Sequence, residues 1–305
     1  MSTRTISPLR QRMIDDMTAR QLGQQTQRFY IRCCQRFATF LDRSPETATA
    51  DDIRRFQLDL AKSDISIHNR NAIVTGVKFL FRVTLRQPDL VAEFYPIRNP
   101  RKIPPVMSPD EIERLLASAK TLRLRVMLSL AYGCGLRIGE VVRLRVGDID
   151  SSQNIIRIVQ SKGRKDRNVM LPPEVLILLR QWWIQRPQKY DRGMPKAERY
   201  LFPSRQNAHV STRQFTRLFH QTAKSADISK RVTPHTLRHS FATHLLDSGT
   251  DIRLIQALLG HHKLEMTAHY ARVATGMIVA VTSPIDQLFS KTAKPKTGRR
   301  QKEPA

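Results

Sequence analysis

The segment TPHTLRHSFATHLLD, residues 233–247 of this 305-residue chain, decides how the C-terminal half folds. Thr233 can cap a helix and Pro234 suits the first helical position, so a helix is predicted from here to residue 247. His235 and Arg238 are three residues apart and therefore share one helix face. The apolar positions predict a buried stripe on this helix: Leu237, Phe241 and Leu245. A helix N-terminus beside an arginine favours a phosphate, although the His-x-x-Arg spacing alone is more typical of an ordinary surface pair.

Downstream, the segment DIRLIQALLGHH, residues 251–262, predicts a second helix over residues 251–259. Gly260 would end this helix in the left-handed conformation, which glycine adopts without strain. His261 follows at a turn, and Tyr270 comes nine residues later in TAHYAR. Taken singly, His261 is typical of a satisfied polar residue and Tyr270 of a core aromatic.

Upstream, the segment GCGLRIGE, residues 133–140, ends one apolar helix predicted over residues 122–133 and begins another. Its glycines allow a tight turn, which directs Arg137 away from the apolar helix. Glu140 could fix that arginine, or it could be an ordinary acid in a first helical turn.

A β-hairpin with a basic tip is predicted over residues 154–171. Residues 155–159 form a β-prone run, SKGRKDR at 161–167 turns, and residues 168–171 return. The remaining predicted helices of this half cover residues 109–119, 173–185 and 211–225.

No single motif is decisive, but their order is. The succession GLRIGE, the hairpin SKGRK, HTLRH, LGH and the later tyrosine resembles the tyrosine recombinase (phage integrase) family, above all its Xer-like and integron- or transposon-associated members. The likeness to the catalytic domain spans about residues 107–272. It implies six catalytic residues: Arg137, Lys162, His235, Arg238, His261 and Tyr270. It also matches Glu140 to a supporting acid and leaves Lys165 as the alternative to Lys162.

Members of that family are site-specific recombinases or integrases that cut and rejoin duplex DNA through a covalent 3′-phosphotyrosyl intermediate. The resemblance implies that Tyr270 is the nucleophile and that the hairpin lysine protonates the departing 5′ oxygen. Physical chemistry agrees, because two guanidiniums can clamp phosphate oxygens bidentately and the covalent link conserves the bond energy. The resemblance therefore implies no ATP, no cofactor and no catalytic metal. His262 and His269 depart from the usual family pattern.

The sequence pattern, together with the family resemblance, predicts a mainly α (α+β) protein in four parts. These are an N-terminal helical core-binding (DNA-binding) domain at 1–95, a basic proline-rich linker at 96–107, a mostly helical catalytic domain with a small antiparallel sheet at 108–275, and a C-terminal segment with a basic tail at 276–305. Four helices are expected within residues 7–86. In the family a C-terminal element docks on a neighbouring protomer, and residues 277–281 and 285–289 are apolar enough for this role.

The net charge of +26 calls for a polyanionic partner, and double-stranded DNA is the favoured one. An anionic membrane surface is the rival partner, but no predicted helix pairs a basic face with a strongly apolar, Trp-bearing one. No apolar run approaches the ~18 residues needed to span a bilayer, so a membrane is not expected as a partner. Without a recognisable signal peptide, the cysteines predict a reduced, cytoplasmic chain: Cys33, Cys34 and Cys134. The resemblance implies a homo-oligomer, a tetramer on two DNA sites, with an accessory DNA-bending protein as a further candidate partner.

Three alternatives stay open at this point. A type IB topoisomerase has a similar active site but yields relaxed DNA, and a non-catalytic DNA-binding protein forms no covalent adduct. A metal-dependent nuclease could use His235, His239 and His261, although HTLRH is not the zinc motif HExxH.

Overall fold

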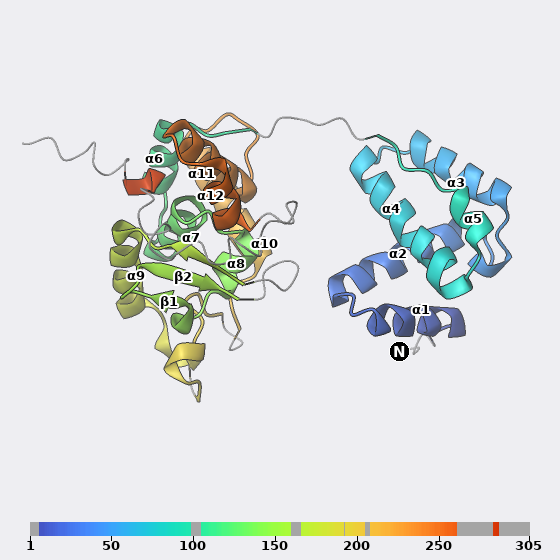
Figure 1. Cartoon of the computed structure of the whole chain (residues 1–305), viewed down its shortest axis with the longest axis horizontal. Coiled ribbons are helices and arrows are strands. Elements are labelled where there is room, and N and C mark those ends of the chain that lie inside the picture. Colours follow the sequence, from blue (N-terminus) through green and yellow to red (C-terminus); the bar gives the residue numbers. More distant parts are fainter. Residues whose placement is uncertain are drawn as a thin grey trace, which may run out of the picture. The chain divides into compact units, whose positions relative to one another are not determined.

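The structure is a computed structural model that describes residues 6–98, 105–159, 166–191, 193–204, 208–260 and 283–286. The chain divides into two compact units, Met1–Lys102 and Ile103–Ala305, each with its own hydrophobic core (Figure 1). Helices dominate both units and the second contains one small antiparallel sheet, which confirms the predicted fold class. None of the described helices is long and apolar enough to cross a membrane.

The first unit is helical throughout its described residues. Its elements are α1 (Pro8–Ala19), α2 (Gln24–Leu41), the 3₁₀ turn η1 (Pro45–Thr47), α3 (Ala50–Lys62), α4 (Ile67–Phe79), the π-helical η2 (Leu80–Leu85) and α5 (Pro88–Ala92). The four helices expected within residues 7–86 are confirmed, but the last of them ends as a π-helix. Phe37 is fully buried between Phe56 and Phe81, with ring centroids 4.9 and 5.8 Å away, so aromatic packing joins α2, α3 and η2.

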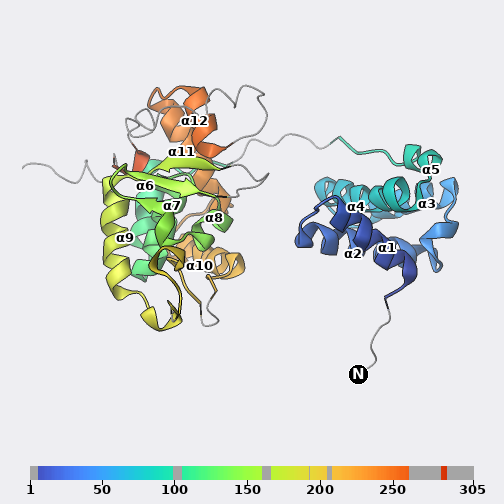
Figure 2. The ribbon, with the colours of Figure 1, turned by 60° about the horizontal axis from the view of Figure 1, so that its bottom comes forward.

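The second unit is built around α7 (Leu122–Gly133), of which every residue from Val126 to Gly133 is buried. This helix contacts α9 and α11, as Figure 2 shows. The other helical elements are α6 (Pro109–Ala117), α8 (Ile138–Arg143), η3 (Val146–Asp148), α9 (Pro173–Gln185), η4 (Gln188–Asp191), η5 (Lys196–Glu198), α10 (Thr212–Ser225), α11 (Pro234–Asp247) and α12 (Ile252–Leu259). The predicted helices of this unit are confirmed to within two residues at their ends.

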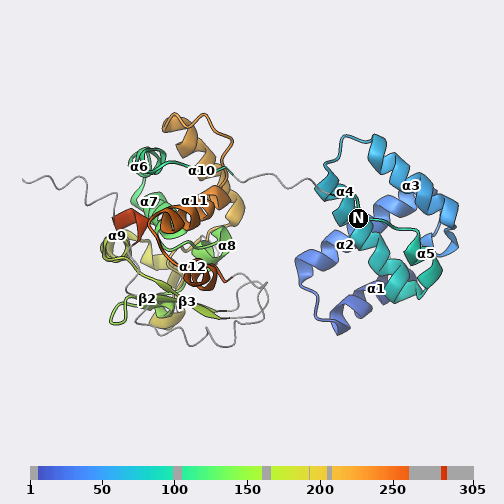
Figure 3. The same ribbon diagram turned by 45° about the horizontal axis from the view of Figure 1, so that its top comes forward.

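The sheet consists of β1 (Ile149–Asp150), β2 (Ile155–Ile158) and β3 (Arg167–Met170), in that order and antiparallel. Strand β2 pairs with β3 so that Ile158 lies opposite Arg167, which confirms the predicted hairpin. The two-residue strand β1 was not expected. Figure 3 shows α12 beside β3, and this contact brings the end of the hairpin to the end of α12.

Two segments outside the helices are fixed to the second unit. Met107, at the end of the expected linker, is fully buried and its N–H donates to Ser240 Oγ at 2.9 Å. Near the other end of the chain, Ser283 Oγ donates to the Gly133 carbonyl at 2.8 Å and Ile285 is buried against Gly133. Residues 283–286 therefore pack on their own chain, while the rest of the apolar segments expected to dock on a neighbour lie outside the described residues.

Candidate active site

Arg137 stands at the start of α8, where a glycine turn fixes its position. Gly135 has φ +62°, and a Cβ at this residue would lie 2.6 Å from the ring of Phe241 on α11, so only glycine lets the turn pack there. The Arg137 N–H donates to Glu140 Oε2 at 2.8 Å, and its Nη1 donates to Oε1 at 2.9 Å. Glu140 thus both caps the first turn of α8 and holds Arg137.

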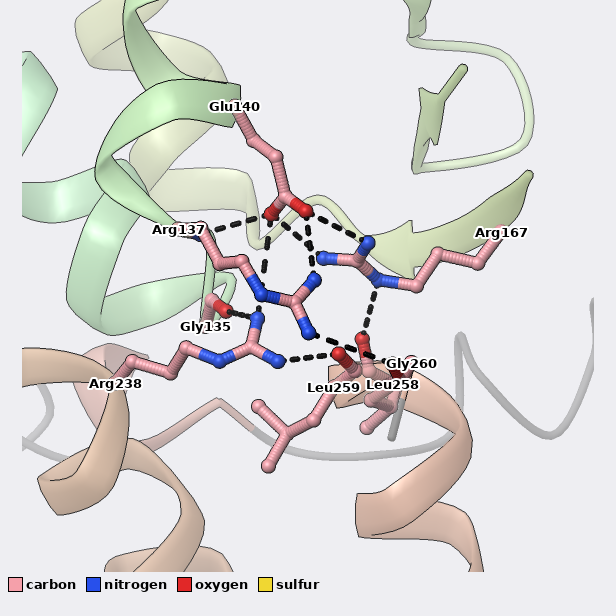
Figure 4. A network of polar contacts seen from close by, with 8 residues as sticks. All are labelled: Gly135, Arg137, Glu140, Arg167, Arg238, Leu258, Leu259 and Gly260. Carbon is pink, nitrogen blue, oxygen red and sulfur yellow. Dashed lines mark hydrogen bonds and ion pairs between the residues drawn. The ribbon is translucent and has the colours of Figure 1, made fainter. Parts of the chain in front are cut away.

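Glu140 also holds a second arginine, which comes from the hairpin. Arg167, the first residue of β3, donates through Nη1 to Oε1 at 2.9 Å and through Nη2 to Oε2 at 2.7 Å, a bidentate pair. Both side chains are buried, with 8% of Arg167 and 5% of Glu140 exposed. Figure 4 shows the Glu140 carboxylate reaching toward both guanidiniums, so one acid joins α8 to the sheet.

Arg238 lies on α11 beside this carboxylate and is also buried. Its Nη1 is 4.0 Å from Glu140 Oε2 and donates to the Gly135 carbonyl at 2.7 Å, while its Nη2 donates to the Leu259 carbonyl. Burial, together with the charges of Arg137 and Arg167, lowers the pKa of the Arg238 guanidinium to about 9, which still leaves it protonated at neutral pH.

The C-terminal end of α12 is the second anchor of these arginines. Three consecutive carbonyls each accept from a different guanidinium: Leu258 from Arg167 at 2.9 Å, Leu259 from Arg238, and Gly260 from Arg137 at 3.4 Å. The last carbonyls of a helix have no partner within the helix and carry its negative dipole end. Cations from three separate elements therefore converge on one helix terminus.

The cluster of three arginines and Glu140 has two positive charges in excess. Burial alone would raise the pKa of the Glu140 carboxyl, but hydrogen bonds and charge from Arg167 and Arg137 hold that pKa at about 2. The carboxylate is thus ionised at neutral pH. Such a site suits an oxyanion whose negative charge grows during a reaction.

His235 lies on the first turn of α11, one turn before Arg238, with its ring only partly accessible to solvent. Partial burial, Arg238 and Arg137 lower the pKa of its imidazole, against an opposing effect of Glu140. His235 is therefore neutral at neutral pH and able to accept a proton.

The structure brings together four of the residues singled out in the sequence: Arg137, Glu140, His235 and Arg238. Lys162, its alternative Lys165, His261 and Tyr270 lie outside the described residues. Sequence reasoning missed Arg167, which it assigned to the exposed tip of the hairpin. A signal was present, because Arg167 and the buried Val169 are two residues apart on a strand and so face the same side.

Known proteins resemble this chain in sequence and in fold. Residues 105–277 match the phage integrase family, and residues 9–89 match the phage integrase N-terminal SAM-like domain. The chain is 31% identical to an integrase/recombinase of Escherichia coli, over 96% of this chain and 99% of that protein, and 32% identical to a tyrosine recombinase of Thermosipho africanus, over 84% and 91%. The fold resembles the crystal structure of a lambda integrase (75–356) dimer bound to a COC′ core site, with a TM-score of 0.64, 19% identity, and coverage of 85% of this chain and 95% of that one. The chain belongs to the phage integrase family and is a tyrosine recombinase, an enzyme that breaks and rejoins DNA.

Proposed function

We propose that this recombinase acts on specific sites in double-stranded DNA, with Arg137 and Arg238 as the clamp of the scissile phosphate and Tyr270 as the nucleophile. The observation that carries the proposal is the buried cluster in which Glu140 and the end of α12 hold both arginines within one network. A phosphodiester carries one negative charge, and its five-coordinate transition state carries two. The two excess positive charges of the cluster match the transition state better than the ground state, which is the condition for catalysis.

In the proposed cleavage step, the oxygen of Tyr270 attacks phosphorus and the bond from phosphorus to the 5′ oxygen breaks. A histidine takes the tyrosine proton, and His235 suits this role because its lowered pKa keeps it neutral. Lys162, or else Lys165, gives its proton to the departing oxygen. In rejoining, a 5′ hydroxyl attacks the 3′-phosphotyrosyl bond and the tyrosine leaves, so neither ATP nor a metal takes part.

Helix α10 has the features of a DNA-contacting helix. Its exposed basic residues are spaced four, three and four apart, which places them on one face: Arg213, Arg217, His220 and Lys224. The opposite face is buried through Phe215 and Phe219, and the helix contains no acid. A helix of this kind fits the major groove, where its cations reach the phosphates.

In the first unit, α2 offers a comparable surface. It has no acidic residue, and its exposed arginines Arg28 and Arg32 have no acidic partner within the described residues. With Arg10 of α1 and several glutamines they line a groove of about 870 Å³. Guanidinium and amide groups are donors suited to phosphate oxygens, so we propose that this unit binds DNA as well.

The proposal extends to assembly: four protomers on two DNA sites, in the cytoplasm. Exchange of DNA strands between two duplexes requires that two DNA sites are bound together, and a monomer on one duplex binds only one.

Covalent trapping tests the nucleophile. Protein is incubated in EDTA with nicked duplexes tiled from the DNA that flanks its gene, and adducts are separated on a denaturing protein gel. We expect an adduct with the wild type and none with Tyr270→Phe. The matched control is Tyr95→Phe, which removes the hydroxyl of an exposed tyrosine in the first unit and is expected to leave adduct formation unchanged.

The other outcomes of this assay distinguish the proposed recombinase from the alternative functions. An adduct that persists in Tyr270→Phe refutes the nucleophile assignment, and strand cleavage that EDTA abolishes indicates a metal-dependent nuclease. Relaxed plasmid without joined partners indicates a topoisomerase. Tight binding without any adduct, when the tiled duplexes include the true site, indicates a non-catalytic DNA-binding protein.

A further inference from the structure

We propose that Arg167 is a positioning residue, which ties the β2–β3 hairpin to the phosphate clamp and thereby places the general-acid lysine at the tip. This inference rests on the proposed function of that lysine. Arg167 is the first residue of β3 and lies opposite Ile158, the last residue of β2, so this pair closes the ladder just before the tip. Whatever fixes Arg167 therefore fixes the strand residue at which β3 begins, close in sequence to both candidate lysines.

Three contacts fix Arg167 on two other elements. Its two Nη atoms hold the Glu140 carboxylate on α8, and its Nε donates to the Leu258 carbonyl at the end of α12. A guanidinium is a planar fork that can make the bidentate pair and the third contact together, whereas an ammonium is a point charge that cannot.

The backbone at the end of α12 leaves room for the Arg167 side chain only because residue 260 is a glycine. Gly260 has φ +61°, and a Cβ at this residue would lie 2.9 Å from Arg167 Cδ. The aliphatic part of Arg167 thus occupies the space that glycine leaves empty, while Arg137 donates to the carbonyl of the same glycine. Arg167 and Arg137 share both of their anchors, Glu140 and the end of α12.

Arg167 differs from the two clamp arginines in what its donors do. Within the described residues its carboxylate and carbonyl contacts use three of its five N–H groups, against two for Arg137 and two for Arg238, although its side chain, at 8% exposed, lies between those of Arg137 at 21% and Arg238 at 6%. Its role is therefore to hold the hairpin in register with Arg137 rather than to bind phosphate itself. Loss of this anchor should leave the arginine clamp in place and misplace the lysine.

A substrate with a sulfur leaving group tests this distinction. In a duplex with a 5′-bridging phosphorothiolate, Tyr270 attack breaks the bond between phosphorus and sulfur and releases a thiolate. A thiol has a pKa of about 8.5, far below that of an alcohol, so its departure needs no protonation. A defect in the general acid is then rescued by sulfur, whereas a defect in the phosphate clamp persists.

The variant is Arg167→Lys, which keeps the charge and loses the fork. We expect adduct formation on the ordinary phosphate to fall by about 10²-fold, the lower end of a general-acid contribution. On the phosphorothiolate we expect a rate within about threefold of the wild type. Arg167→Met should show the same selectivity. Because one preparation cleaves both substrates, the ratio of the two rates does not depend on the fraction of folded protein.

The matched control is Arg157→Lys, the same change on the neighbouring strand β2, where the side chain is half exposed and pairs with Asp150 at 2.5 Å. It should leave both rates unchanged. Equal losses on the two substrates in Arg167→Lys would show that Arg167 acts on the clamp or the fold, and no loss on either would show that it positions nothing; either result overturns the proposal. Lys162→Ala and Lys165→Ala identify the acid separately: if neither shows rescue by sulfur, the proposed lysine role fails, and an adduct that survives in Tyr270→Phe refutes the proposed nucleophile.

Discussion

The two units contain the same local motif put to different uses. In each, a buried acid stands at the third position of a helix, closes a capping box and contacts arginines. In the first unit Asp52 accepts from the Thr49 N–H at 2.8 Å and pairs with Arg43 and Arg55, each at 2.5 Å. In the second, Glu140 accepts from the Arg137 N–H and pairs with Arg137 and Arg167.

The arginines make the difference. Arg43 and Arg55 lie close to Asp52 in the sequence and are exposed, so water solvates their charges. The role of Asp52 is therefore limited to the capping box at the start of α3. Arg167 and Arg238 are 8% and 6% exposed and come from elements far from Glu140 in the sequence. Burial makes their charges depend on Glu140 and on the end of α12. The capping box of α8 is part of the candidate active site because its acid, Glu140, also contacts buried arginines from distant elements.

The largest effect is expected from removal of a buried cation. Arg238→Ala should lower adduct formation by about 10²–10³-fold, because the loss of one preorganised donor to a developing oxyanion costs this much. Arg43→Ala, the matched change in the Asp52 network, should leave the rate within about twofold. Single-turnover trapping at saturating protein measures both rates, and a small effect of Arg238→Ala would remove this arginine from the clamp.

The next largest effect concerns stability. Glu140→Gln leaves Arg167 and Arg238 buried without their countercharge, and we expect the free energy of unfolding to fall by about 3–5 kcal/mol. Asp52→Asn should cost about 1 kcal/mol or less, because an asparagine oxygen can still accept from the Thr49 N–H and the exposed arginines become hydrated. Urea denaturation measures both variants. Equal losses would contradict the distinction drawn between the two networks.

The pH dependence of stability sharpens this comparison. The folded pKa of Glu140 is about 2, below its ordinary value of 4.5, so ionised Glu140 stabilises the fold above pH 4.5. This contribution, about 3 kcal/mol, should be lost as the pH falls from 4.5 through 2. The difference in unfolding free energy between the wild type and Glu140→Gln should shrink over the same range. A difference that stays constant with pH would mean that the carboxylate charge does not stabilise the cluster.

Helix starts and the residues within the recognised motifs could be predicted, whereas a tertiary contact that no motif marks could not. The start of α11 follows from local capping chemistry, and the structure confirms it, with Thr233 as the N-cap and Pro234 as the first helical residue. The order of the motifs indicated that Arg137 and Arg238 belong to one site. Arg167 was missed because its partner Glu140 is 27 residues away and because the whole segment SKGRKDR was assigned to a turn, although Val169 two residues later indicated the side that Arg167 faces.

The anchor at the end of α12 could not be predicted for a different reason. Its acceptors are the backbone carbonyls of residues 258–260, and every residue has such a carbonyl whatever its side chain. The sequence indicated only the glycine that ends the helix. The two-residue strand β1 is likewise too short to show a period of two.

The smallest effect is expected from a variant that disturbs only the contact between Gly260 and Arg167. Gly260→Ala should cost about 1–2 kcal/mol for the left-handed backbone and should also displace Arg167. Gly249→Ala is the matched control, because Gly249 has φ +85° but nothing lies within 4 Å of its added Cβ. Both variants should therefore lose stability by urea denaturation, Gly260→Ala at least as much as Gly249→Ala, while only Gly260→Ala should slow cleavage of the phosphate substrate. If both retain the wild-type cleavage rate, the end of α12 can adjust to the methyl group without moving the hairpin, and Glu140 alone must set the position of Arg167.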